Sequence, residues 1–274
     1  MGDTRPSEPV AWHLTRLFRG RDGASASKDA GRDPLCLVVL NQPLDRLPVL
    51  RSLWENSVTR VAADGGANRL YEAGGARGDA SFDNLDVVIG DLDSLRDDAR
   101  RYFESRPRPA RVIHDPDQYS TDFGKAVSHI RRSHPGVVDI VAVGGLGGRV
   151  DQGLSQLHHL YLFQKQPRYA EGRMYLVSGE SVTFLLQAGR HRIEVRDDDG
   201  GGGGGEDVFA KYVGIIPIKE KSRITTRGLE WDVEDWETQF GGQLSTSNHV
   251  LPDTRVVEVE TTTDVLFTIA LRAE

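Results

Sequence analysis

The chain has 274 residues, which at roughly 150 residues per domain suggests about two domains. Its residues are 38% apolar and 27% charged, a composition typical of folded globular proteins, so extensive disorder is excluded. The 34 basic and 41 acidic residues are interspersed and no apolar run approaches ~18 residues, which argues against nucleic-acid and membrane partners.

Residues 1–33 are rich in Gly, Ser, Asp, Arg and Pro around one apolar island that contains Trp12. We expect a largely disordered leader, although the island is apolar enough to dock on the folded body. Its acidic residues argue against a mitochondrial transit peptide, and it has no signal-peptide apolar segment. The single cysteine, Cys36, lies in an apolar run and is expected to be buried, which fits a reducing, cytoplasmic location.

From residue 35, short apolar runs alternate with amphipathic segments. The runs are 35–40, 59–63, 86–89, 111–114, 137–143 and 174–177, and the amphipathic segments are 47–54, 68–72, 97–103, 121–132 and 150–163. Uninterrupted apolar strands alternating with helices are typical of a parallel sheet that is covered on both faces. We therefore predict an α/β domain over residues 34–180, with an open, mostly parallel sheet and helices on both faces.

After about residue 180 the helical period disappears and short β-rich runs follow one another. They are 181–186, 191–195, 212–218, 223–226, 255–260 and 265–271. Short strands separated by turn residues favour an antiparallel arrangement, so we predict an all-β sandwich domain over residues 181–274. Six consecutive glycines at 200–205 indicate a flexible loop at about 197–207, to which we assign no function.

Acidic side chains follow the apolar runs of the first domain. These are Asp64, Asp91 and Asp93, Asp115 and Asp117, and Asp151, with Asp122 at the start of the helix after the fourth run. Because ligands bind outside the carboxyl ends of such strands, we expect several of these carboxylates to meet there. A divalent cation would offset their repulsion, and oxygen ligands favour Mg²⁺. Any single Asp also fits a turn or helix cap, but Asp91 and Asp93 can converge on one ion.

Two glycine-rich loops lie between a predicted strand and a predicted helix. Gly65 and Gly66 follow Asp64, and residues 144–148 precede Arg149. Free backbone N–H groups at such positions bind phosphate, although tight turns also require glycine. We expect Lys125 and Arg149 to be the cations that contact a polyphosphate at this edge.

The second loop also approximates a dinucleotide-binding fingerprint, which suggests a nicotinamide-dependent dehydrogenase as a competing function. The match is incomplete, because its last position is Val150 and because it occurs in the fifth βα unit. Hydride transfer, moreover, has no need of so many acidic residues.

Several motifs resemble those of the thiamine pyrophosphokinase family, in the same order and spacing. In the first domain they are 61–68 (VAADGGAN), 88–94 (VIGDLDS), 117–125 (DQYSTDFGK) and 144–152 (GGLGGRVDQ). In the second domain they are 214–217 (GIIP), 225–231 (TTRGLEW) and 245–248 (STSN). The resemblance is to the eukaryotic form and extends over about residues 35–272.

The resemblance implies a homodimeric enzyme that transfers the pyrophosphoryl group of ATP to the hydroxyl of thiamine, giving thiamine diphosphate and AMP. It also implies that each active site is shared between two chains, with ATP and Mg²⁺ on the α/β domain and thiamine on the β-sandwich. A non-catalytic regulator that binds thiamine or nucleotide is the remaining alternative, and the intact acidic set argues against it.

The residue roles that the resemblance implies fall into three groups. The catalytic residues are Asp91, Asp93, Asp122 and Asp151, of which Asp91, Asp93 and Asp122 bind the metal; the ATP contacts are Asp64, Gly65, Gly66, Gln118, Lys125, Gly147, Gly148 and Arg149; and the thiamine contacts are Thr226, Trp231, Ser247 and Asn248. Asp122 is our candidate for the base that accepts the thiamine hydroxyl proton, unless it binds only metal. Without its motif, Trp231 would be interpreted as part of the sandwich core.

Overall fold

The computed structural model describes residues 8–19, 33–164, 169–196 and 207–273. The chain divides into two compact units, one comprising Phe18–Gly179 and the other combining Met1–Leu17 with Glu180–Glu274. The predicted glycine loop at 200–205 lies outside the described residues. Within the described ranges, no helix is long and apolar enough to span a bilayer.

Parallel strands form the sheet of the Phe18–Gly179 unit, which we call the α/β unit. The strands are β2 (Leu35–Val39), β3 (Thr59–Ala63), β4 (Val87–Gly90), β5 (Arg111–His114), β6 (Asp139–Val143) and β7 (Met174–Val177), in the spatial order β7-β6-β2-β3-β4-β5. Each neighbouring pair is parallel. The chain runs outward from β2 to β5 and then returns to β6 on the other side of β2. This order places a topological switch between β2 and β6, where open α/β sheets bind ligands.

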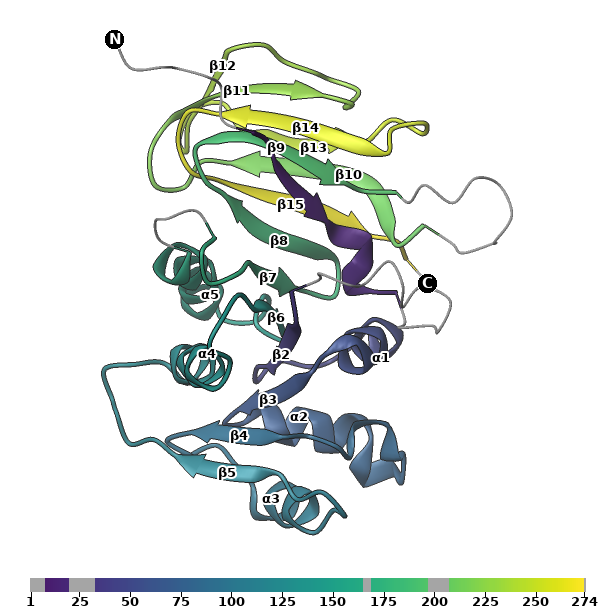
Figure 1. Cartoon of the computed structure of the whole chain (residues 1–274), viewed down its shortest axis with the longest axis vertical. Helices are drawn as coiled ribbons and strands as arrows, with labels where there is room; N and C mark the ends of the chain where they lie inside the picture. The colour runs from purple at the N-terminus through teal and green to yellow at the C-terminus, as the bar shows by residue number, and fades with distance from the viewer. Residues whose placement is uncertain (1–7, 20–32, 165–168, 197–206, 274) are drawn as a thin grey trace. The chain divides into compact units, whose positions relative to one another are not determined.

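Helices connect these strands and cover both faces of the sheet. They are α1 (Leu47–Asn56), α2 (Gly66–Ala73), α3 (Asp97–Glu104), α4 (Asp122–Ser133) and α5 (Val150–Phe163), with short 3₁₀ turns η2 (Gly75–Arg77) and η3 (Ala80–Phe82). Figure 1 shows α4 and α5 on one side of the strands and α1 and α2 on the other. Right-handed crossovers account for this division, because the chain reverses direction along the sheet after β5. The predicted open parallel sheet with helices on both faces is confirmed.

The core of the α/β unit explains why its strands are uninterrupted apolar runs. Every residue of β2, β4 and β7 is buried. On α4, the buried side chains Phe123, Val127 and Ile130 recur at helical spacing and face the strands. Burial of this apolar area from water, worth roughly 25 cal/mol per Å², fixes the strand ends that carry the acidic residues.

The other unit, which we call the β unit, consists of two mainly antiparallel groups of strands. The strands are β8 (Ser181–Leu186), β9 (Gly189–Glu194), β10 (Phe209–Ile216), β11 (Ser222–Arg227), β12 (Trp236–Thr238), β13 (Ser245–His249), β14 (Val256–Thr261) and β15 (Val265–Leu271). One group has the order β13-β10-β15-β8, and the other has β9-β14-β11-β12 with β1 at its edge. On β14, buried Val257 and Val259 alternate with exposed glutamates, as expected when one face meets the core. The predicted β-rich second domain is confirmed.

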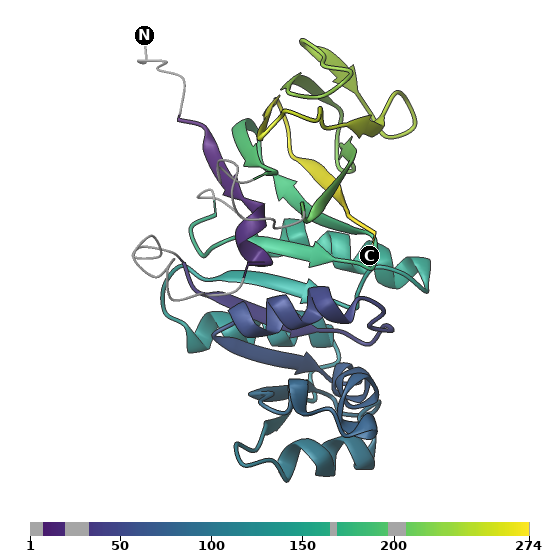
Figure 2. The same cartoon turned by 90° about the vertical axis from the view of Figure 1, so that its right-hand side faces the viewer.

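The N-terminal segment differs from the expected disordered leader. Strand β1 (Val10–His13) pairs in parallel with β9 and leads into the 3₁₀ turn η1 (Leu14–Leu17), drawn in purple in Figure 2. Trp12 is fully buried, with its ring centroid 4.5 Å from that of Phe184, and its Nε1 donates a hydrogen bond of 3.0 Å to His191 Nδ1. For these residues the expected disorder is not found: the apolar island is buried and its backbone pairs with a sheet edge, which is the docking that its apolar character allowed.

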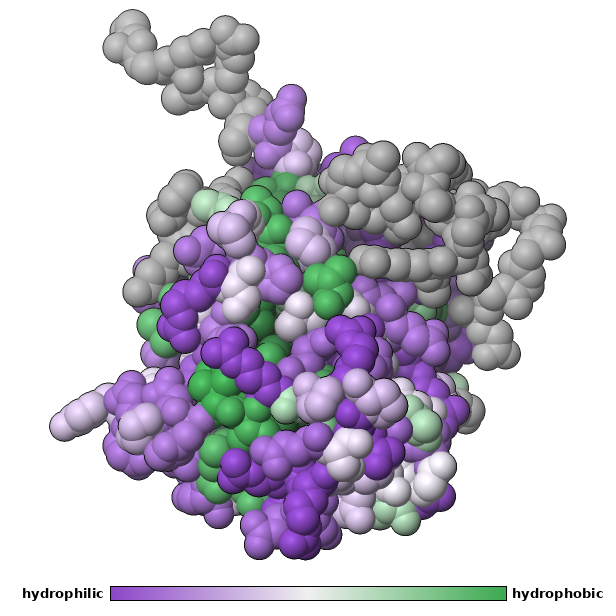
Figure 3. All heavy atoms as spheres, turned by 60° about the horizontal axis from the view of Figure 1, so that its bottom comes forward, coloured by the Kyte–Doolittle hydropathy of each residue, from purple (hydrophilic) through white to green (hydrophobic). Residues whose placement is uncertain are grey.

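Several large apolar side chains remain exposed on the described residues. Val150 and Leu154 on α5 are 77% and 57% exposed, and Trp231 and Phe240 in the β unit are 56% and 64% exposed. Figure 3 shows one face of the molecule, on which hydrophilic residues predominate and apolar residues gather in patches. Exposed apolar groups of this kind mark surfaces that bind ligands or other chains when they form contiguous patches.

We predict that Trp12→Ala will lower the free energy of unfolding by about 3–5 kcal/mol, the usual cost of removing a core Trp. Guanidinium denaturation followed by circular dichroism measures the change. Trp231→Ala is the matched control, because that side chain is 56% exposed and its removal should cost much less. A loss below about 1 kcal/mol in the Trp12 variant would show that the N-terminal strand contributes little to stability.

Candidate active site

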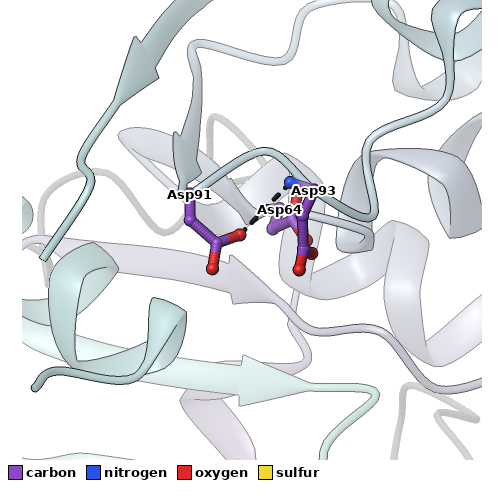
Figure 4. Close-up of side chains that lie close together, drawn as sticks. All are labelled: Asp64, Asp91 and Asp93. Carbon is purple, nitrogen blue, oxygen red and sulfur yellow. Dashed lines mark hydrogen bonds between the residues drawn. The ribbon is translucent and has the colours of Figure 1, made fainter. Parts of the chain in front are cut away.

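Three carboxylates converge at the carboxyl ends of β3 and β4. Asp64 follows β3, Asp91 and Asp93 follow β4, and one oxygen of each lies within 4.8 Å of the others. Figure 4 shows these side chains close together, with Asp91 and Asp93 on one loop, where Asp93 N donates a 3.2 Å hydrogen bond to Asp91 Oδ1. We call Asp64, Asp91 and Asp93 the acidic cluster.

Asp64 is the buried member of the acidic cluster. Its Oδ2 accepts a hydrogen bond of 3.2 Å from Ser94 N, whereas its buried Oδ1 has no hydrogen-bond partner among the described residues. Burial raises the pKa of the Asp64 carboxyl above its usual range, opposed by the Ser94 hydrogen bond and reinforced by the charge of Asp122. A buried carboxylate oxygen without a partner fits a metal ligand, so the residues present suit a divalent cation.

The backbone at the acidic cluster adopts uncommon conformations. Asp64 and Leu92 have φ values of 43° and 64°, in the left-handed region that a bulky residue such as Leu rarely enters. Gly90 is required by close approach, because a Cβ there would lie 2.8 Å from Asp64 Cβ and 2.9 Å from Asp122 Oδ1. Strain of this kind clusters at functional sites, and here it turns the loop so that its carboxylates converge.

Asp122 lies beside the acidic cluster as the first residue of α4. Its Oδ1 accepts hydrogen bonds from Asp91 N at 3.3 Å and from Lys125 Nζ at 3.1 Å. The Lys125 side chain is only 2% exposed, so this ion pair is largely shielded from solvent. The sequence predicts that Asp91, Asp93 and Asp122 bind the metal and that Asp64 contacts ATP. In the structure, Asp91 and Asp93 instead converge with Asp64, and Asp122 lies next to these three residues.

The two glycine loops lie at the carboxyl ends of strands β3 and β6. Gly65 and Gly66 open α2, and a Cβ at Gly66 would lie 2.1 Å from Val39 O, so only glycine fits there. Gly147 and Gly148, with φ of 122° and 65°, line a cavity of about 380 Å³ at the ends of β2, β6 and β7. This cavity lies at the topological switch.

The structure does not bring every predicted residue to the acidic cluster. Arg149 and Asp151 are exposed at the start of α5 and form an ion pair with each other at 2.6 Å. Gln118 is exposed in the loop before α4. In the same loop, Asp117 N donates to Asp115 Oδ1, and Ser120 Oγ donates to Asp117 Oδ2. Asp115 and Asp117 therefore act as turn residues, the simpler interpretation of an acid after a strand.

In the β unit, Trp231 lies on the surface, not in the core. Its ring centroid is 4.9 Å from that of His249, and its backbone N and O are both hydrogen-bonded by the Asn248 side chain, at 3.2 and 2.9 Å. The buried Asn248 side chain holds Trp231 in place through these two hydrogen bonds, whereas its neighbour in the chain, Ser247, is exposed. Thr226 is also buried and donates from its hydroxyl to Asp232, so it does not face the surface.

Some residues that position the site were not predicted as site residues. Asn68 clamps the loop of the acidic cluster, donating from Nδ2 to Ser94 O at 2.7 Å and accepting from Arg96 N at 3.0 Å. Asn41 packs against Gly65 and accepts from Arg69 Nε. Asn68 is the last residue of the motif at 61–68, and this position in the sequence is the one feature that could have marked it as a site residue.

We predict that Asp64→Asn will raise the melting temperature of the metal-free protein at pH 7. The folded-state pKa of Asp64 is raised, so its ionised form destabilises the folded state, and stability falls as pH rises from the unfolded to the folded value. The gain should therefore vanish below the ordinary Asp pKa of about 3.9. Thermal melts in EDTA across pH measure it, with the exposed Asp97→Asn as control. A lower melting temperature for Asp64→Asn at pH 7 would contradict the argument.

Comparisons with known proteins cover both units. The family model for the thiamin pyrophosphokinase catalytic domain matches residues 50–170, and that for the thiamin pyrophosphokinase vitamin B1 binding domain matches residues 190–266. Thiamine pyrophosphokinase 1 of Arabidopsis thaliana is 35% identical over 250 residues, which is 86% of each chain. The thiamine pyrophosphokinase of Saccharomyces cerevisiae is 26% identical and aligns over 86% of this chain and 85% of its own.

Solved structures share the fold of this chain. The thiamin pyrophosphokinase from Candida albicans superposes with a TM-score of 0.79 at 22% identity, covering 98% of this chain and 95% of its own. The yeast enzyme superposes with a TM-score of 0.77 at 23% identity, covering 99% and 94%. From the family models and the sequence relatives, the chain belongs to the thiamine pyrophosphokinase family.

Proposed function

We propose that this chain transfers the pyrophosphoryl group of ATP to the hydroxyl of thiamine, forming thiamine diphosphate and AMP. The observation that carries the proposal is the convergence of Asp64, Asp91 and Asp93 within 4.8 Å of one another in a chain of this family. Transfer at phosphorus depends on positioning and on neutralising charge at the phosphate oxygens, and a cation held by these carboxylates serves that purpose.

Asp64, Asp91 and Asp93 are the residues that we propose to hold Mg²⁺, with Asp122 beside them. Their ligand atoms are all carboxylate oxygens, which Mg²⁺ prefers, and it commonly takes one or two carboxylates together with substrate phosphates. When bound, the ion neutralises charge on the triphosphate. Lys125 adds a positive charge to the same place through its ion pair with Asp122.

We place ATP at the topological switch between β2 and β6. The cavity of about 380 Å³ there is within the usual size of small-molecule sites, and Gly147 and Gly148 line it. Helix α5 begins directly after this loop, so its N-terminal N–H groups and dipole favour an anion. Arg149 is exposed and paired only at the surface with Asp151, so it is able to turn toward a phosphate. Gln118 is a further proposed contact.

Thiamine, in this proposal, meets the β unit at Trp231. A cationic thiazolium is attracted to an aromatic face, and the Trp231 indole is 56% exposed and so offers one. Ser247, exposed on β13 next to Asn248 in the chain, provides a hydroxyl for hydrogen bonding. Asn248 and Thr226 support this surface from beneath, Asn248 through both backbone hydrogen bonds to Trp231.

Asp122 is our candidate for the base. Of its two carboxylate oxygens, Oδ1 accepts from Asp91 N and Lys125 Nζ, which leaves Oδ2 to accept a proton among the contacts of the described residues. The thiamine hydroxyl would give its proton to Asp122 while its oxygen bonds to the β-phosphorus, and the bond from that phosphorus to AMP breaks.

We further propose that the protein acts in the cytoplasm as a homodimer whose sites are shared between chains. Val150 and Leu154 on α5 are exposed apolar residues one helical turn apart, which a second copy would cover. In this proposal, the ATP site of one chain and the thiamine site of the other complete one active site. Recovery of activity on mixing two inactive variants tests whether the sites are shared between chains.

Asp93→Asn should lower turnover at least about tenfold. Mutating a residue that only hydrogen-bonds to a metal ligand typically lowers metal affinity or activity 10–100-fold, and losing a direct ligand should lower it no less. Release of AMP from ATP, with and without thiamine and Mg²⁺, measures it. Asp97→Asn is the matched control, since Asp97 is an exposed acid on the neighbouring helix α3. Near-normal turnover in the Asp93 variant would remove this residue from the metal site.

Trp231→Ala should weaken thiamine binding roughly five- to thirtyfold, which corresponds to a loss of about 1–2 kcal/mol of cation–π and stacking energy. The KM for thiamine should rise well above any change in that for ATP. Phe240→Ala, which removes another exposed ring of the β unit, is the control. Unchanged thiamine kinetics in a folded Trp231 variant would rule out the pocket role.

Mixing the Trp231→Ala and Asp93→Asn proteins should restore part of the activity if sites are shared between chains. A heterodimer would then contain one site with both residues intact. Subunit exchange is verified by native mass spectrometry. Failure to recover activity after verified exchange would show that each site lies within one chain.

A further inference from the structure

His159 lies on α5 and faces the N-terminus of α4. It is 4% exposed, and its ring packs between Phe123 of α4 and Phe163 of α5, at centroid distances of 4.9 and 5.8 Å. It lies outside the motifs of the sequence, and the proposed chemistry makes no use of it. Buried polar groups are almost always hydrogen-bonded, so the partners of the His159 ring nitrogens indicate its role.

The hydrogen bonds of His159 have a fixed direction. Its Nδ1 contacts Ser155 O, which only accepts, so Nδ1 carries a proton and donates. Burial lowers the pKa of His159, which keeps the imidazole neutral and leaves Nε2 as an acceptor. The hydroxyl of Thr121, 2.8 Å from Nε2, must therefore donate to it.

Thr121 in turn determines how α4 begins. It is the N-cap residue, and its Oγ1 accepts a hydrogen bond of 3.0 Å from Gly124 N. Because its hydrogen is already directed at His159, the lone pairs of Oγ1 face the helix. The first turn fixed by this cap carries Asp122 and Lys125, whose side chains pair beside the acidic cluster.

We propose that His159 is a positioning residue that orients the Thr121 hydroxyl and so places the Asp122–Lys125 pair against the acidic cluster. The consequence for turnover rests on the proposed function, whereas the consequence for the helix cap does not. Helix α5 follows its N-cap residue Arg149, and we propose that its N-terminus faces phosphate. His159 therefore links this helix to α4, which begins with the candidate base Asp122.

Two substitutions separate this role from packing alone. His159→Phe keeps an aromatic ring between Phe123 and Phe163 but removes the acceptor for Thr121. His159→Gln loses the ring but keeps a side-chain oxygen at about the reach of Nε2. If His159 only filled the core, the Phe variant would match the wild type and the Gln variant would be the worse of the two. If it positions Thr121, the order is reversed.

The experiment combines steady-state kinetics with hydrogen exchange on the full chain. For His159→Phe we expect about a fivefold lower kcat and a higher Mg²⁺ requirement, because the cap at Thr121 is weakened when its hydroxyl loses its acceptor, with the KM for thiamine unchanged. Amides of residues 122–126 should exchange faster while those of the last turn of α4 stay protected. His159→Gln should resemble the wild type in both measurements.

Wild-type kinetics and exchange in His159→Phe, or equal impairment in the two variants, would overturn the proposal. Thiamine-dependent AMP release in the wild type tests the proposed function separately. If the wild type releases no AMP while exchange still separates Phe from Gln, the proposed function fails and the role of His159 at the cap stands.

Discussion

Repulsion among carboxylates is the constraint on which the α/β unit depends. Asp64, Asp91 and Asp93 lie within 4.8 Å of one another, and Asp64 is buried with one oxygen unpartnered among the described residues. Unfavourable in isolation, this arrangement costs stability unless a cation offsets it. The strained loop, the glycine at position 90 and the hydrogen bonds of Asn68 hold the carboxylates together. This geometry lowers the stability of the metal-free protein and is one that a divalent ion would complete.

In the β unit, the large aromatic side chain of Trp231 is held at the surface. Trp231 would gain by burial, yet both of its backbone polar groups are held by the buried Asn248 side chain. Asn248 and Thr226 therefore stabilise the turn that presents the indole, and the exposed Trp231 and Ser247 are the residues that we propose to contact thiamine. In the α/β unit, similarly, buried His159 is hydrogen-bonded to Thr121, and Thr121 caps the helix that begins with Asp122.

Local sequence pattern was enough to predict the α/β order and the β-rich second domain, because both follow from strand and helix periodicity. It also placed Asp64, Asp91 and Asp93 at strand ends, since the carboxyl ends of parallel strands meet at one edge. It could not identify Asp64 as the third member of the cluster or Asn248 as a support, because these roles depend on burial. The pattern allowed the island around Trp12 to dock but could not say where, because its partner His191 lies 179 residues away, beyond any local pattern.

We propose that Asp64, Asp91 and Asp93 together bind one divalent cation. Crystals grown with Mn²⁺ and ATP, with diffraction recorded at the manganese absorption edge, test it directly. We expect an anomalous peak between the three carboxylates, at the roughly 2.0–2.6 Å that separates oxygen ligands from divalent cations. A bound nucleotide with no peak between these residues, or a peak held by other side chains, would contradict it.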